Sequence, residues 1–272
     1  MKTTKVCLGF PWYNGPDAHT YTRYMEIVHY FGRLQERSYW LNSPLGDDQD
    51  RVKKAVLPPL SPEGDEECEI TAADGVFEFG YSNEGGLSLQ GLAREEVVEG
   101  ALAWGADWLF MWDDDMIFPW SSFLKLWRHQ KPVVAALAFT SRVPFQPVIY
   151  RVREVHDRIG LKRQSEPILD YPKDQLISDA DIGGPIAFGA GVVLINMNVF
   201  KQLGKPWFHS TGCGEDWMFC LRCLDSGIPR YVDTSVKTIH KGYRPTWVDE
   251  QTYESHREAK PEVYEAVAKD IR

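Results

Sequence analysis

An excess of basic residues, a long apolar run and a framework of paired cysteines are all lacking in this sequence of 272 residues. Thirty lysines and arginines against 39 aspartates and glutamates give a formal net charge of −9. This charge disfavours non-specific binding to nucleic-acid phosphates. No run approaches the roughly 20 apolar residues that a membrane-spanning helix needs, and the first residues lack the pattern of a secretory signal peptide. We therefore expect no membrane span and a cytoplasmic location.

Cysteines are few and odd in number: Cys7, Cys68, Cys213, Cys220 and Cys223. This set predicts no disulfide framework and fits a reducing compartment. The Cys220-x-x-Cys223 spacing matches half of a zinc site, but a second pair is absent, so packing within a helix is the favoured interpretation. The phosphate-binding patterns G-x-x-x-x-G-K-S/T and G-x-G-x-x-G are absent as well.

The most informative stretch is DWLFMWDDDMIFP, residues 107–119. Its apolar run predicts a strand buried on both faces, and three carboxylates follow that strand directly. Unpaired carboxylates cannot remain in a dry core, so the strand must end at a polar crevice, where open α/β sheets bind their ligands. If the backbone stays extended, Asp113 and Asp115 point to the same side and offer oxygen ligands to Mg²⁺ or Mn²⁺. The simpler alternative is an acidic surface turn.

The rest of the chain alternates between strand and helix patterns, which predicts an α/β protein. Residues 42–91 are turn-rich and hard to assign, and residues 151–181 predict a surface excursion that includes a hairpin. We expect strands near 5–10, 76–79, 133–139 and 192–197, short edge strands at 231–233 and 236–240, and helices near 20–34, 92–104, 121–128, 199–203, 215–224 and 249–272.

Three further positions draw attention because their residue types suit a ligand. Gly189-Ala190-Gly191 would let a ligand approach the backbone closely. Glu215 and Asp216 stand at a predicted helix start, where acids also stabilise the helix dipole. Arg94 lies in the first turn of its helix and opposes that dipole, so it is either an ordinary surface residue or one that meets an anion.

In their order and spacing these segments resemble a GT-A fold glycosyltransferase of the family-2 type, of the small stand-alone kind found in bacteria and phages. The matching motifs, between about residues 5 and 244, are Pro-x-Tyr-Asn, Ala-Arg-Glu, Asp-x-Asp, Gly-x-Gly, Gly-Glu-Asp-Trp and a late His. The resemblance implies a single GT-A (Rossmann-like) catalytic domain over residues 1–272, with a mixed, mainly parallel central sheet and helices on both faces. Its parts would be a nucleotide-sugar-binding half (1–118), an acceptor-side half (119–245) and a C-terminal helical tail (246–272).

The resemblance also implies roles for individual residues. Asp216, with Glu215 beside it, would be catalytic, and Trp217 would contact the acceptor. The metal site for Mn²⁺ or Mg²⁺ would be formed by Asp113, Asp115 and His240. The donor would be bound by Pro11, Tyr13, Asn14, Arg94, Asp113, Asp114, Gly189, Gly191, Lys241 and Arg244. The chain departs from the family where Glu95 replaces an asparagine, and Asp74 is only a candidate for the aspartate that reads the donor base.

These features favour a metal-dependent inverting glycosyltransferase that moves a sugar from a nucleotide sugar to an acceptor hydroxyl. A UDP-sugar is the default donor and a GDP-sugar the second choice; the acceptor is a glycan, a small molecule, a protein or a modified base. The cation would stabilise the leaving diphosphate as a Lewis acid, and Asp216 would take the hydroxyl proton. Three alternatives remain open: a retaining transferase on the same fold, a metal-dependent nucleotidyltransferase, and a non-catalytic module that binds nucleotides or glycans.

Overall fold

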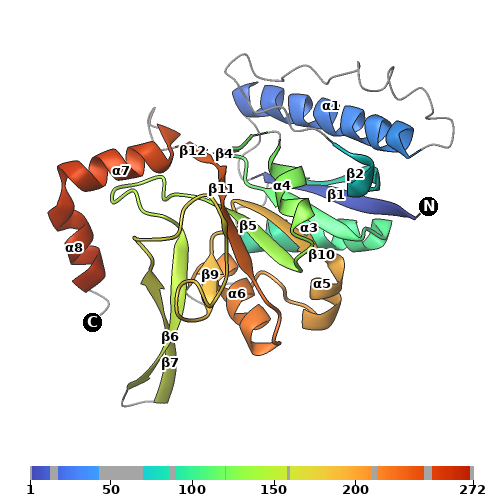
Figure 1. The fold of residues 1–272 in the computed structure, drawn as a ribbon. Helices are drawn as coiled ribbons and strands as arrows, with labels where there is room; N and C mark the ends of the chain where they lie inside the picture. The colour runs from blue at the N-terminus through green and yellow to red at the C-terminus, as the bar shows by residue number, and fades with distance from the viewer. Residues whose placement is uncertain are drawn as a thin grey trace.

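The computed structural model describes residues 2–12, 18–42, 70–85, 90–119, 121–157, 160–209, 213–241 and 247–269. At its centre lies a seven-stranded sheet with the strand order β2-β1-β3-β10-β5-β11-β8 (Figure 1). Five strands run in one direction: β1 (Thr3–Trp12), β2 (Val76–Gly85), β3 (Trp108–Trp112), β5 (Val133–Leu137) and β11 (Tyr231–Lys237). The two antiparallel strands are β8 (Leu176–Ile177) and β10 (Val192–Asn196).

Helices cover both faces of this sheet because its strands are apolar on both sides. In β3, the three aromatic residues face one core cluster, while Leu109 and Met111 face the other, as the two-residue period of a strand requires. The aromatic side packs against α1 (Ala18–Leu41) and α4 (Ser122–Arg128). The aliphatic side packs against α3 (Gln90–Trp104), α5 (Met197–Leu203) and α6 (Glu215–Asp225). The predicted fold class, α/β with a mixed, mainly parallel central sheet and helices on both faces, is therefore confirmed.

Two small sheets flank the central one. The first joins β6 (Ile149–Asp157), β7 (Gly160–Pro167) and β9 (Ile186–Phe188), and its β6–β7 hairpin projects from the body of the molecule (Figure 1). The second joins β4 (Met116–Ile117), β12 (Ile239–Lys241) and β13 (Trp247–Val248). The hairpin expected within residues 151–181 is thus confirmed.

The structure corrects the expected C-terminal elements. The predicted edge strand at 231–233 is part of a longer strand, β11, which lies between β5 and β8 rather than at the edge. The tail forms two helices, α7 (Glu250–Ala259) and α8 (Pro261–Lys269), because proline begins a new helix more readily than it continues one. Tyr253 and Tyr264 are buried beneath them, so this tail packs on the core.

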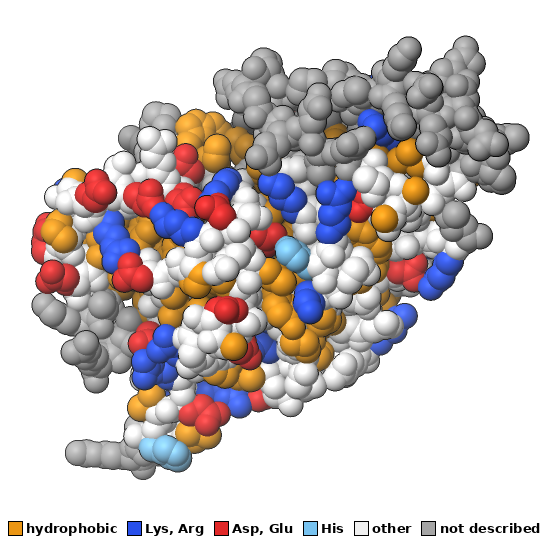
Figure 2. Space-filling model, viewed as in Figure 1, with side chains coloured by type: hydrophobic (Ala, Val, Ile, Leu, Met, Phe, Trp, Pro, Cys, Tyr) orange, Lys and Arg blue, Asp and Glu red, His pale blue; other side chains and the backbone are white. Residues whose placement is uncertain are grey.

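The distribution of charged side chains on the surface agrees with the composition, in which acids outnumber bases. On the face shown in Figure 2, acidic and basic side chains are interspersed, without an extended basic stripe among the described residues. Within the described part of the chain, no helix is both long and apolar enough to cross a membrane.

Candidate active site

The three acids stand where the sequence pattern places them, at the carboxyl edge of the central sheet. β3 ends at Trp112, and the Asp113 N–H donates to the carbonyl of Gly191 at 2.9 Å. The backbone does not stay extended after β3, because the Met116 N–H donates to the Asp113 carbonyl at 3.1 Å and closes a turn. This turn separates the directions of Asp113 and Asp115, which consequently have different partners.

Asp113 is held by Arg94, which also holds an acid from α6. The Arg94 Nη2 atom lies 2.7 and 2.8 Å from the two carboxylate oxygens of Asp113, and Nη1 lies 2.6 Å from Glu215 Oε1. Arg94 is only 2% exposed, so it is not an ordinary surface residue. The anions that it meets at the helix start are the two protein carboxylates. Burial raises the pKa of Asp113 to about 6, and the Arg94 charge opposes that rise. Arg94 therefore ties the end of β3 to the start of α6.

Glu95, the residue that departs from the family pattern, also faces inward. Its carboxylate accepts a hydrogen bond from the backbone N–H of Phe208, and the Phe208 ring centroid lies 5.7 Å from the guanidinium carbon of Arg94. Both residues of this helix turn thus fix the segment that precedes α6. A backbone partner of this kind leaves no signature in the sequence, which is why sequence reasoning missed it.

Asp115 meets the late histidine. β12 pairs with β4, in register His240 to Met116, and the Lys241 N–H donates to the Asp115 carbonyl at 2.8 Å. This pairing places His240 Nε2 3.0 Å from Asp115 Oδ2, although the residues are 125 positions apart. Burial lowers the pKa of His240, but the hydrogen bond and negative charge of Asp115 outweigh burial and raise it above the ordinary value.

The other ring nitrogen, Nδ1, determines which tautomer the neutral imidazole adopts. His240 Nδ1 lies 2.6 Å from the carbonyl oxygen of Phe139, and because a carbonyl can only accept, Nδ1 carries a proton. In the neutral ring, Nε2 then presents a lone pair to the Asp115 carboxylate, and two acceptors at this distance need a proton or a cation between them. A histidine that donates its other N–H to a backbone carbonyl is the arrangement seen in metal-binding histidines.

The residues present therefore fit a divalent cation. Two adjacent ligands of an octahedral ion with bonds of about 2.1 Å are separated by about 3.0 Å, which matches the 3.0 Å between His240 Nε2 and Asp115 Oδ2. Asp113 does not complete the set, because both its oxygens face Arg94. No group of three or more His, Cys, Asp and Glu residues in the described ranges could by itself hold a metal ion. A cation here would need further oxygen ligands from water or substrate.

The glycine segment joins these acids to Asp216. A Cβ atom on Gly189 would lie 3.4 Å from Asp216 Oδ2 and 2.7 Å from Val148 Cγ1, whereas Gly191 adjoins Asp113. Two residues span at most about 7 Å of chain, so Asp216 and the acids after β3 flank the same short stretch of backbone. The Trp217 N–H donates to Asp216 Oδ1 at 2.8 Å and fixes the carboxylate. The backbone of this segment thus closely approaches Asp216, and the expected approach of a ligand stays a prediction.

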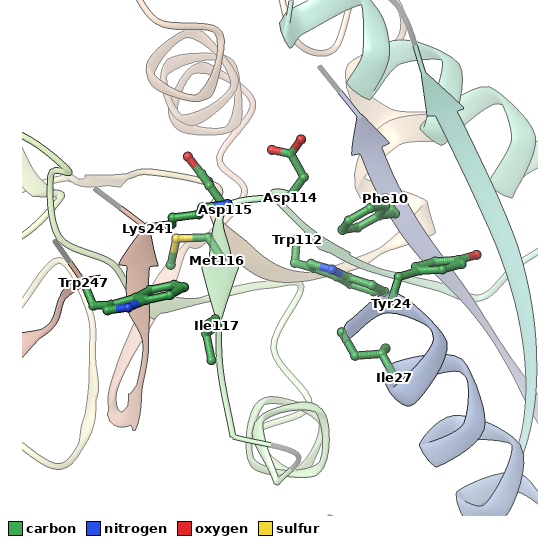
Figure 3. Close-up of a pocket in the computed structure, with 10 residues that line it drawn as sticks. All are labelled: Phe10, Tyr24, Ile27, Trp112, Asp114, Asp115, Met116, Ile117, Lys241 and Trp247. Carbon is green, nitrogen blue, oxygen red and sulfur yellow. The ribbon is translucent and has the colours of Figure 1, made fainter. Parts of the chain in front are cut away.

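The remaining candidate residues are distributed around this edge. Asp114 and Lys241 line a small slot with an aromatic floor, and Figure 3 shows the carboxylates of Asp114 and Asp115 projecting together at its mouth. Its volume of about 20 Å³ admits little more than a water molecule. Pro11 is buried near the end of β1. Three expected donor-binding residues lie outside the described residues: Tyr13, Asn14 and Arg244.

Asp74 is not brought to this site. It precedes β2, so it lies at the opposite edge of the sheet, and its carboxylate accepts from Arg128 Nε and Nη2, both at 2.8 Å. The candidate base-reading role of Asp74 is therefore wrong, because the residue holds α4 to the start of β2.

Comparisons with known proteins give matches among solved structures. No protein-family model matches the chain, and no curated protein matches it. Among solved structures it is similar to A197 from STIV (TM-score 0.46, 11% identity, 91% of this chain and 94% of that one). A structure of GalNAc-T7 with UDP, GalNAc and Mn²⁺ is also similar (TM-score 0.46, 14% identity, 97% and 49% of the chains). UDP-glucose pyrophosphorylase complexed with UDP-glucose gives a TM-score of 0.38 at 10% identity, over 97% and 100% of the chains.

Proposed function

We propose that this protein is a metal-dependent glycosyltransferase that moves a sugar from a nucleotide sugar, with UDP-sugar as the favoured donor, to an acceptor hydroxyl with inversion. The observation that supports it most is the pair formed by Asp115 and His240. An imidazole whose Nδ1 proton is committed to a carbonyl faces a carboxylate at the carboxyl edge of the sheet. A second carboxylate, Asp216, adjoins the same edge across the glycine segment.

Asp115 and His240 would hold the cation. When bound, a divalent cation supplies Lewis-acid stabilisation of the charge on the leaving diphosphate. Lys241 follows the histidine and lines the slot beside Asp114 and Asp115, so its ammonium would lie near the donor phosphates. Arg244 has the same proposed role.

Asp216 would be the general base. It stands in the first turn of α6, where backbone N–H groups favour a negative charge, and its Oδ1 atom is fixed by the Trp217 N–H. The fixed carboxylate would accept the proton of the acceptor hydroxyl as that oxygen attacks the anomeric carbon. Arg94 would position this base, because it fastens Glu215, the preceding residue, to Asp113.

The test combines binding with product analysis. Thermal unfolding would be followed with UDP and with GDP, each with and without Mn²⁺, since a ligand that binds only the folded state raises the unfolding temperature. We expect one nucleotide to stabilise the wild type more with Mn²⁺, and Asp115→Asn to lose that additional stabilisation. Glu96→Gln, an exposed acid on α3, is the matched control and should keep it. A stabilisation that is independent of Mn²⁺ in the wild type would contradict the metal site.

The products separate the remaining alternatives. A transferase releases a nucleoside diphosphate, whereas a nucleotidyltransferase given a sugar phosphate and a nucleoside triphosphate releases pyrophosphate. Inverted configuration in the product, determined by NMR, supports Asp216 as the base; retained configuration excludes that role. Asp216→Asn should lower transfer roughly 10²- to 10⁴-fold while nucleotide binding persists. Unchanged transfer in this variant would exclude the proposed mechanism.

A further inference from the structure

A hollow of about 610 Å³ opens beside Asp216, between the start of α6 and the β6–β7 hairpin. This volume lies within the range of about 300–1,000 Å³ that small-ligand pockets occupy. Tyr150 from β6 and Gln164 and Ser165 from β7 form one side, and Trp217 stands next to Asp216 on the other. The hairpin, which projects from the body of the molecule in Figure 1, thus supplies a wall to the site.

Two aromatic rings form a corner in this hollow. The Tyr150 and Trp217 centroids lie 6.3 Å apart with an interplanar angle of 87°. Burial raises the pKa of Tyr150, the hydrogen bond with Gln146 opposes that rise, and the nearby charge of Asp216 adds to it. The hydroxyl therefore stays protonated at neutral pH and can donate a hydrogen bond. An aromatic face with a polar group at its rim suits a ligand that has an apolar face and polar edges. A pyranose ring has this form, with C–H groups on its faces and hydroxyls around its edge.

The charges of the hollow disfavour an anionic ligand. The one basic residue among its described lining is Arg163, and its Nη1 lies 2.6 Å from Asp225 Oδ1 while its Nε lies 3.5 Å from Glu154 Oε1. Its charge is therefore matched by two acids, and the acid of the lining, Asp216, would repel a phosphate. The amide of Gln164 and the hydroxyl of Ser165 are neutral groups that both donate and accept, as hydroxyl-rich ligands require.

We propose that the acceptor is a neutral saccharide that binds in this hollow, with one ring against the Tyr150–Trp217 corner and one hydroxyl directed to Asp216. This assignment rests on the proposed transferase function. The acceptor oxygen forms a bond to the anomeric carbon of the nucleotide sugar, the bond from that carbon to the diphosphate oxygen breaks, and its electron pair leaves with the nucleoside diphosphate. The hydroxyl proton passes to Asp216.

The experiment measures saccharide binding separately from catalysis. Saturation-transfer NMR would be recorded on the full chain with UDP and Mg²⁺, which unlike Mn²⁺ is diamagnetic and does not broaden the ligand signals, using cellobiose, maltose, lactose and N,N′-diacetylchitobiose as probes. We expect at least one to bind, with binding weakened roughly tenfold by Trp217→Ala and roughly three- to tenfold by Gln164→Ala. Gln164 is exposed, so its variant tests the site without disturbing the core. Leu161→Ala, at a 52% exposed position on the same hairpin, is the matched control and should bind as the wild type does.

A second readout, release of nucleoside diphosphate from UDP-glucose, separates this inference from the function on which it rests. Acceleration by the bound saccharide supports both, if Gln164→Ala needs roughly three- to tenfold more saccharide for the same acceleration and Leu161→Ala behaves as the wild type does. Release without binding of any of the four saccharides, or acceleration only by a peptide or by hydroxymethylated DNA, overturns the acceptor class and leaves the transferase intact. Saccharide binding with no release from any nucleotide sugar tested overturns the transferase, and with it the acceptor role of the hollow.

Discussion

The bridge from Arg94 to Asp113 and Glu215 offers the sharpest test of the structure. Replacement by methionine keeps most of the side-chain volume but removes the charge, and it leaves two acids in a site where Arg94 is 2% exposed. Removing one partner of a buried ion pair costs about 3–5 kcal/mol because the remaining charge is uncompensated. At roughly 2–4 °C per kcal/mol for a chain of this size, Arg94→Met should lower Tm by roughly 6–20 °C.

Urea unfolding of Arg94→Met should show a lower midpoint with an unchanged slope. The matched control is Arg153→Met, which removes an arginine paired with Glu166 on the hairpin at a position 49% exposed, where such a pair contributes little to stability. A triple variant that adds Asp113→Asn and Glu215→Gln should recover much of the stability, since no buried charge then lacks a partner. If Arg94→Met loses no more than Arg153→Met, or if the triple variant is as unstable as the single one, the reasoning about buried charge is refuted.

Three other substitutions follow from the packing and the charges. Gly80→Ala would place a Cβ 2.9 Å from the Trp104 ring and should lower the free energy of unfolding by about 1–3 kcal/mol. Gly32→Ala on α1 meets nothing within 4 Å and should raise it by about 0.5–1 kcal/mol. Thermal unfolding that ranks the two variants in the reverse order would contradict this packing. Burial raises the pKa of Asp74, but Arg128 and the Thr71 N–H outweigh burial and lower it, so its stabilisation is complete above the unfolded pKa of about 4 and is lost as the pH falls through the lower folded value. The deficit of Asp74→Asn, about 1–2 kcal/mol at pH 7, should therefore shrink below about pH 4 in urea titrations; a constant deficit would exclude the ion pair as its source.

Local patterns in the sequence predict much of this fold. The run from Trp108 to Trp112 is apolar at every position because both faces of β3 are covered, and the acids end it because the sheet ends there. The helical period predicts α1 and α3 for the same reason, since each buries one apolar stripe. β2 was harder to assign, because it pairs with β1 from beyond a turn-rich stretch of the chain and its glycines weaken the strand pattern.

The pairings at the site were less accessible to sequence reasoning. Arg94 shows only an unfavourable position at a helix start, while its two partners lie 19 and 121 residues away. Asp113 was expected to share a cation with Asp115, but one turn of backbone redirects it to Arg94. The meeting of Asp115 with His240 was expected from resemblance and is found, because an edge pairing between two short strands fixes it.

The pairing of β12 with β4 also determines how much of the chain is needed to form the Asp115–His240 pair. β12 follows β11, so all seven strands of the central sheet precede, in the chain, the imidazole that meets Asp115. A nascent chain released up to β10 would carry the acids alone, with nothing opposite them to share a cation. In the proposed metal site, binding of Mn²⁺ would therefore require these last strands to be in place.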